Sequence, residues 1–273
     1  MTMSAQSTSA IIRYIIPGDE KPVYVASQGG TDAQLEINVD YDNREVVIND
    51  ARELEQSANL DREGFCLQAH RTAITDFYHL DNSKAAYEAE LKQLVLPVVN
   101  GDDLLVFDHT LRSNSADIRG VRQTRETASI IHNDYTPKSA RVRLRDLLSD
   151  EEAEHRLKNR FAIINVWRTI SAPVFQFPLT CCDAQTIDEE DVIAVERRAV
   201  DRIGELELVR FNPAHRWYYY PAMDKDEVLL IKTFDSEQDG RASRSIHTAF
   251  NNPLASPDAP PRESIESRML VFF

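Results

Sequence analysis

Basic residues are scarce in this chain of 273 residues: 31 Lys and Arg stand against 45 Asp and Glu, so the formal net charge is −14. Nucleic-acid backbones are bound by clustered Lys and Arg, and this balance argues against such binding. Cysteine is also rare. Cys66 and the adjacent pair Cys181-Cys182 form neither a disulfide framework nor a CxxC metal pattern. We therefore expect a cytoplasmic protein in a reducing environment.

Long hydrophobic runs are missing as well. The apolar run at residues 11–16 is interrupted by Arg13 and lacks the basic segment and cleavage site of a signal peptide, so it indicates a strand. No run reaches the roughly 20 residues that a membrane-spanning helix needs, and we expect no membrane association. With 42% hydrophobic residues the chain can form a sizeable core. We expect residues 1–10 to be a mobile tail and residues 11–273 to form one domain.

Short β-strands dominate the pattern after residue 159. Apolar or alternating segments are separated by polar turns, which is typical of a sandwich or barrel. We therefore expect a mainly β fold with flanking helices. The predicted strands span residues 161–167, 205–211, 217–220, 228–234, 246–250 and 265–273.

The N-terminal half combines strands with a helix. Residues 35–39 and 45–48 alternate on either side of the polar segment 40–43, which predicts a β-hairpin. Residues 81–99 carry the apolar stripe of a helix, capped by one of its first three residues and ended by Pro97.

A strand-like segment leads into His132-Asn133-Asp134, and a second β-like segment carries His247. Residues two apart on a strand point to the same face, so His132 and Asp134 can bind one metal together. Two imidazoles and one carboxylate form the facial triad of non-haem iron(II) oxygenases, which leaves coordination positions open. The pattern predicts an Fe(II) site that uses 2-oxoglutarate and O2.

The same His-x-Asp pattern occurs at His79-Leu80-Asp81. That copy lies at the expected start of a helix, where Asp81 has a sufficient role as an N-cap. The strand context of His132 is the one that metal binding requires. We therefore assign the metal to the second copy and a structural role to the first.

Arg262 and Ser264 follow His247 by 15 and 17 residues. On a strand they share a face, and a guanidinium offers a fixed fork of donors to a carboxylate. We interpret the pair as the anchor for the distal carboxylate of 2-oxoglutarate. The alternative is a surface ion pair of Arg262 with Glu263 or Glu266, which the position after the triad makes weaker.

Asn165 lies in the predicted strand 161–167, on the same face as apolar side chains. A lone amide on an apolar face must be hydrogen-bonded. It could hold the keto-acid end of the co-substrate or the substrate, and it could equally be a core residue that ties down a loop.

Three arginines, Arg119, Arg122 and Arg125, precede the predicted iron motif. They form either a solvated edge or a rim that binds an acidic group of the substrate. Because charged side chains on a surface are usually solvated, the first interpretation is favoured.

Motifs such as His132-Asn133-Asp134-Tyr135-Thr136, Asn165-Val166-Trp167-Arg168 and Pro261-Arg262-Glu263-Ser264 follow one another in a specific order along the chain. This series resembles the AsaB/CmcJ-like hydroxylase/desaturase family, closely over residues 100–273 and more loosely before them. One departure is Thr169, where the family pattern has Pro. Further motifs of the series are Phe107-Asp108-His109-Thr110, Arg216-Trp217-Tyr218-Tyr219 and His247-Thr248-Ala249-Phe250.

The resemblance implies a double-stranded β-helix (jelly-roll, cupin-like) core. It implies an oxygenase that hydroxylates or desaturates a small-molecule secondary metabolite and converts 2-oxoglutarate to succinate and CO2. His132, Asp134 and His247 would bind the iron, and Arg262 with Ser264 the co-substrate.

Two other classes of protein stay open at this point. A jelly-roll without catalysis could bind a metal or ligand as the partner of another biosynthetic enzyme. A zinc hydrolase could use two His and one carboxylate, but it leaves the Arg262-x-Ser264 pair unexplained. A homo-oligomer and a partner protein from the same pathway are both compatible with the sequence.

Overall fold

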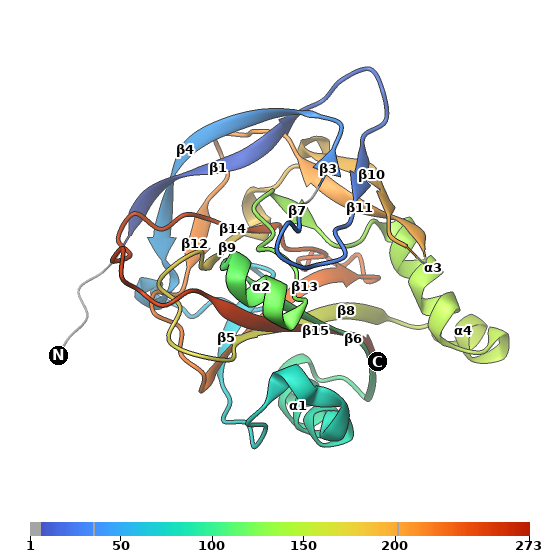
Figure 1. Ribbon diagram of the computed structural model, residues 1–273. Helices are drawn as coiled ribbons and strands as arrows, with labels where there is room; N and C mark the ends of the chain where they lie inside the picture. Colours follow the sequence, from blue (N-terminus) through green and yellow to red (C-terminus); the bar gives the residue numbers. More distant parts are fainter. Residues whose placement is uncertain (1–6, 35, 201) are drawn as a thin grey trace.

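The computed structural model describes residues 7–34, 36–200 and 202–273, and its main body consists of two curled β-sheets (Figure 1). Each of the strands predicted after residue 159 is present. The larger sheet has the order β1 (Thr8–Ile16), β4 (Asp40–Asp50), β12 (Trp217–Tyr219), β9 (Leu179–Cys182), β14 (His247–Ala249), β7 (His132–Asn133), β11 (Ile203–Val209), β10 (Val192–Arg198), β2 (Val23–Val25) and β3 (Glu36–Ile37). The smaller sheet has the order β5 (Phe65–Ala69), β13 (Glu227–Asp235), β8 (Phe161–Thr169), β15 (Glu263–Phe272) and β6 (Asp103–Ser113).

The two sheets share a hydrophobic core. Phe65 and Trp167 of the smaller sheet pack in one cluster with Cys181 and Ala249 of the larger sheet. Burial of this apolar area stabilises the pair of sheets by roughly 25 cal/mol per Å². The polar site residues described below therefore lie in a protein interior, where each needs a partner.

Helices flank the sheets (Figure 1). Helix α1 (Lys84–Val99) covers the outer face of the smaller sheet, because its Tyr87, Leu91 and Val95 share a hydrophobic cluster with β8 and β15. The other helices are α2 (Ala116–Arg122), α3 (Pro137–Leu147) and α4 (Asp150–Arg156), with 3-10 turns at Ala51–Glu53, Phe77–Asn82, Ala184–Thr186 and Glu189–Asp191.

Strand β8 lies at the centre of the smaller sheet and is buried on both faces. Ala162, Ile164 and Val166 pack toward α1, so the alternate residues, including Asn165, face the interior between the sheets. Thr169, the departure from the family pattern, ends β8 and its hydroxyl donates to the carbonyl of Ala172 at 2.8 Å. The strand is thus unbroken up to this position.

Two predictions for the N-terminal region need correction. Strand β1 begins at Thr8, so the predicted tail of residues 1–10 extends too far, while residues 1–6 lie outside the described chain. Residues 40–43 do not form a turn, because they belong to β4, which pairs with β1 from Asp40 to Ile48. Pairing with a strand distant in sequence overrides the local turn preference of Asp and Asn.

The helix prediction was right in position and wrong at its end. Helix α1 passes Pro97 and ends at Val99, with Asn100 in a left-handed conformation after it. Pro97 lies in the last turn, where its missing N–H removes one helical hydrogen bond without preventing the turn. At the other end Ser83 is the N-cap residue, and Asp81 lies in the preceding 3-10 turn.

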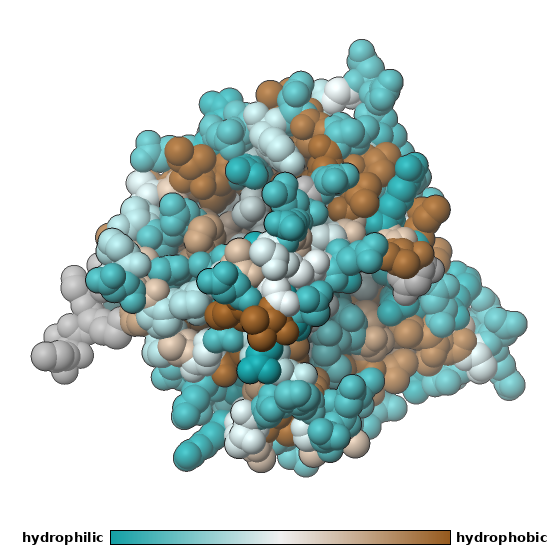
Figure 2. Space-filling model, viewed as in Figure 1, coloured by the Kyte–Doolittle hydropathy of each residue, from teal (hydrophilic) through white to brown (hydrophobic). Residues whose placement is uncertain are grey.

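The face seen in Figure 2 is mainly hydrophilic, with hydrophobic groups in small separate patches. Ile11 and Val47, from the paired strands β1 and β4, are among the exposed hydrophobic side chains. In the described part of the chain no helix combines the length and the apolar character that crossing a membrane requires.

Candidate metal centre and active site

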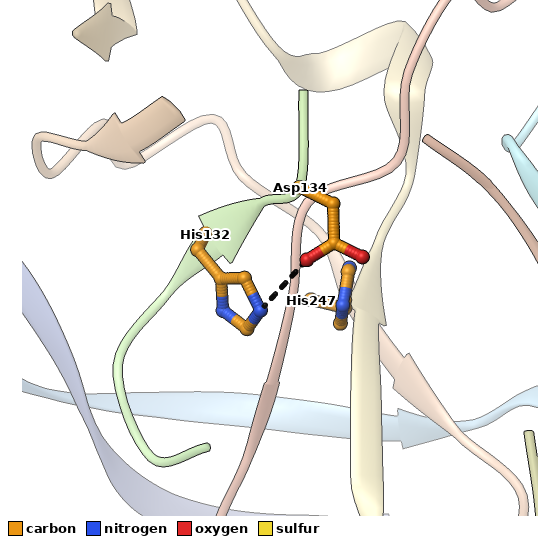
Figure 3. Close-up of side chains that lie close together, drawn as sticks. All are labelled: His132, Asp134 and His247. Carbon is orange, nitrogen blue, oxygen red and sulfur yellow. Dashed lines mark ion pairs between the residues drawn. The ribbon is translucent and has the colours of Figure 1, made fainter. Parts of the chain in front are cut away.

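Two neighbouring strands of the larger sheet bring the predicted metal ligands together (Figure 3). His132 on β7 pairs directly with His247 on β14, and their ring centroids are 4.5 Å apart. Asp134 follows β7. One potential ligand atom from each of these three residues lies within 4.8 Å of the other two. The structure thus assembles a donor set of two imidazoles and one carboxylate, which suits iron(II).

Hydrogen bonds orient both imidazole rings. Nδ1 of His132 lies 2.8 Å from the carbonyl of Ile130, and Nδ1 of His247 lies 3.2 Å from the carbonyl of Ser245. A carbonyl only accepts, so each Nδ1 carries the proton and each Nε2 keeps a lone pair for a metal. Burial, with a contribution from His247, lowers the pKa of His132 to about 3. The His132 ring is therefore neutral at physiological pH.

The Asp134 carboxylate is held through one of its two oxygens. Its Oδ2 accepts hydrogen bonds from Nδ2 of Asn165 at 2.7 Å and from Nε of Arg268 at 2.8 Å. Its Oδ1 lies 3.7 Å from Nε2 of His132 and is the oxygen available to a metal. Burial raises the pKa of Asp134, but Arg268 and the two imidazoles outweigh it and hold the pKa below its ordinary value. The carboxylate is ionised.

Arg268 is a site residue that the sequence analysis did not single out. Besides Asp134, its guanidinium donates to Oδ2 of Asp108 at 2.6 Å and to the carboxylate of Glu266. These acidic groups raise the pKa of Arg268 against the opposing effect of burial. The signal for it was present, because Ser264, Glu266 and Arg268 occupy every second position of β15 and therefore share one face of the strand.

Asn165 contacts the metal site through its amide nitrogen. Nδ2 donates to Asp134 and, at 3.0 Å, to Oε1 of Glu266. Its Oδ1 is buried without a hydrogen-bond partner among the described residues. Asn165 therefore orients the carboxylate ligand. Its Oδ1 only accepts hydrogen bonds, as do the oxygens of 2-oxoglutarate, so the predicted contact of Asn165 with the co-substrate stays a prediction that this oxygen does not support.

Arg262 and Ser264 are buried and incompletely paired. Arg262 is 2% exposed and donates from Nη1 to the carbonyl of Phe177 at 2.6 Å, while its Nε and the Ser264 hydroxyl have no partner among the described residues. Burial, with Arg112 nearby, lowers the pKa of Arg262 to about 9. A buried cation and hydroxyl without an anion fit the carboxylate of a bound 2-oxoglutarate.

The surface ion pair considered for Arg262 is not formed in the described structure. Glu263 instead accepts a hydrogen bond from the hydroxyl of Tyr78, and Glu266 pairs with Arg268. His109, another histidine of the chain, does not belong to the metal site. Its Nδ1 lies 2.8 Å from the Ser267 hydroxyl.

A cavity of about 420 Å³ opens at the metal ligands. His132 and Asp134 form part of its wall, and Phe107, Tyr135 and Leu206 add apolar surface. A partly apolar cavity of this size beside oriented metal ligands can hold a small organic molecule.

A jelly-roll with two imidazoles and one carboxylate beside a cavity defines the class of non-haem iron oxygenases. A sequence model of the family described as an oxidoreductase/YMDC permease-like domain matches residues 12–272. The hydroxylase/desaturase efuI of Hormonema carpetanum is 32% identical, over 85% of both chains.

A further relative agrees in sequence, and a solved structure that carries the same name agrees in fold. The Fe(II)/2-oxoglutarate-dependent dioxygenase nvfI of Aspergillus novofumigatus is 31% identical, over 88% of this chain and 87% of its own. A solved structure of the iron and alpha-ketoglutarate-dependent endoperoxidase NvfI has a TM-score of 0.84 and 28% identity, and covers 99% of both chains.

The chain belongs to the family of Fe(II)/2-oxoglutarate-dependent hydroxylases and desaturases. The predictions of a jelly-roll fold, of an enzyme and of Fe(II), 2-oxoglutarate and O2 as its cofactors are confirmed. The relatives are named as hydroxylases, desaturases and dioxygenases, which favours the oxygenase over a non-catalytic jelly-roll.

Proposed function

We propose that His132, Asp134 and His247 bind ferrous iron and that Arg262 with Ser264 binds the distal carboxylate of 2-oxoglutarate. The observation that carries this proposal is the orientation of the donor set. Both Nδ1 atoms are occupied by backbone carbonyls, and one oxygen of Asp134 stays available to a metal. The chain then hydroxylates or desaturates a small-molecule secondary metabolite.

Bound iron and 2-oxoglutarate supply an oxidant for unactivated C–H bonds, with O2 consumed and succinate and CO2 released. The chain's own residues position these groups. Asn165 and Arg268 fix the Asp134 carboxylate, so its orientation does not depend on the metal. Arg262 is buried and neutralises the distal carboxylate of 2-oxoglutarate. The apolar part of the cavity holds the carbon frame of the substrate.

Several finer points belong to the same proposal. We propose that the chain from the start of β1 at Thr8 to residue 273 acts as one domain. We also propose that the protein is cytoplasmic, which suits its three unpaired, buried cysteines. Self-association through the strands that carry Ile11 and Val47 would cover exposed hydrophobic side chains. A partner protein from the same pathway is the other arrangement compatible with this surface.

The test is an anaerobic titration of the protein with Fe(II) and 2-oxoglutarate, followed by the visible metal-to-ligand charge-transfer band. We expect a band in the wild type that is absent in His132→Ala. A folded wild-type protein that binds no iron in the presence of 2-oxoglutarate would refute the proposal and favour the non-catalytic jelly-roll. Activity with Zn(II) in the absence of 2-oxoglutarate would favour the hydrolase.

A further inference from the structure

The cavity beside the metal ligands is strongly basic in a protein of net charge −14. Eight Lys or Arg side chains and four Asp or Glu side chains line it, an excess of four positive charges. Ferrous iron adds two positive charges and 2-oxoglutarate two negative ones. The excess therefore persists when metal and co-substrate are both bound.

The four acidic side chains are not available to neutralise the remaining positive charge, because each already forms an ion pair with a basic residue. The pairs are Asp108 and Asp134 with Arg268, Glu196 with Arg198, and Glu205 with Lys21 and Lys138.

Arg125 and Arg197 lack such partners. Neither guanidinium has an ion pair or hydrogen bond with any residue of the described chain, although both side chains line the cavity and are half-buried. Burial lowers the pKa of each. The neighbouring guanidinium groups of Arg112 and Arg197 lower the pKa of Arg125 further, and that of Arg268 lowers the pKa of Arg197 further. Positive charges that are held close together in a half-buried wall repel one another. Their arrangement becomes favourable only when an anion binds between them.

Backbone pairing holds these two side chains at the cavity. Arg125 forms a bridge with Arg112 of β6, with its N–H donating to the carbonyl of Leu111 at 3.1 Å. Arg197 lies within β10 and pairs with Tyr24 of β2. Both are thus held by sheet hydrogen bonds, so a ligand would meet a wall that is already ordered.

The other two arginines that precede His132 differ from Arg125. Arg119 donates to backbone carbonyls, including that of Thr31 at 3.1 Å, and Arg122 lies over the ring of Tyr78, 4.5 Å from its centroid. The solvated edge favoured from the sequence describes Arg122, whereas Arg125 faces the cavity.

We propose that the organic substrate carries an anionic oxygen group, a carboxylate or a phosphate, which Arg125 and Arg197 bind. This inference rests on the proposed oxygenase function and names its substrate class. The co-substrate is assigned to the separate, incompletely paired groups Arg262 and Ser264, neither of which lines this cavity. The rest of the substrate then lies against the apolar wall that includes Phe107 and Leu206.

The test uses three probes of one frame: 1-naphthylacetate, 1-naphthyl phosphate and the neutral 1-naphthylacetamide. Their affinities for the protein loaded with Fe(II) and 2-oxoglutarate are measured anaerobically by calorimetry. We expect at least one anion to bind about tenfold more tightly than the amide. Arg125→Gln and Arg197→Gln should each remove most of this preference, and Arg122→Gln should keep it. The ratio of the two anion affinities distinguishes carboxylate from phosphate.

The charge-transfer band of each variant is the second measurement. A retained band with an unchanged 2-oxoglutarate affinity shows that the variant is folded and that the lost group served the substrate. Equal affinities for the anions and the amide, no binding of any probe, or a preference that survives in both variants would overturn the inference. So would loss of 2-oxoglutarate affinity in both variants. Absence of the band from the wild type would instead refute the proposed function.

Discussion

The chain contains the His-x-Asp pattern twice, and the two copies have different fates. His79 lies in an exposed 3-10 turn, where its Nδ1 pairs with Asp76 at 2.7 Å. His132 lies in a buried strand, where a neighbouring strand places His247 directly opposite. The comparison teaches that the pattern alone does not make a metal site. A second strand must supply the other imidazole, and buried neighbours must orient the carboxylate.

The two copies also differ in the residues that orient their His and Asp side chains. The second copy has Ile130, Asn165 and Arg268 hydrogen-bonded to its His and Asp. The first copy has only an ion pair at the surface, where water screens the two charges and the pair contributes little. Metal ligands held by such hydrogen-bond partners lose less conformational entropy on binding, and removal of a partner typically weakens metal binding by about 10- to 100-fold.

The largest expected effect comes from deleting the imidazole in each copy. His132→Ala should abolish iron binding, because one of three ligands is lost and no described side chain stands ready to replace it. His79→Ala should bind iron as the wild type does. Equilibrium dialysis with Fe(II) under argon measures both. Equal losses of iron binding in the two variants would show that the two copies do not differ as metal sites.

A second, smaller effect separates the co-substrate from the metal. Arg262→Gln should weaken 2-oxoglutarate binding by roughly 30-fold or more, about 2 kcal/mol, because a carboxylate buried without its cation is left uncompensated. Iron affinity without 2-oxoglutarate should stay unchanged. Titration of the charge-transfer band with 2-oxoglutarate measures the first and dialysis the second. An unchanged 2-oxoglutarate affinity would remove Arg262 from the co-substrate site.

The smallest effect concerns the partner residues of the two copies. Asn165→Ala should weaken iron binding by about tenfold, because Asp134 keeps Arg268 but loses one hydrogen bond. Asp76→Asn, which alters the partner of His79, is the matched control and should leave iron affinity unchanged. Dialysis at several iron concentrations resolves the difference. If Asn165→Ala binds iron as well as the control, the amide serves only the fold.

Local pattern predicted much of the fold. Short apolar or alternating segments between polar turns identified strands such as β8 and β15, because a strand that is buried on both faces is apolar along much of its length. The local pattern failed at residues 40–43, because these polar residues of β4 have the composition of a turn. Only the pairing of β4 with β1 reveals the strand, and that pairing is not local.

The sequence by itself determined the ligand types and their order along the chain, since His-x-Asp on a strand and a distal His have a recognisable spacing. Tertiary structure decided which copy of the pattern became the site, because strand pairing placed His247 opposite His132 and left His79 at the surface. It also decided the roles of Arg268 and Arg125. A guanidinium acts on whatever lies within a few ångströms, and the fold alone sets those neighbours.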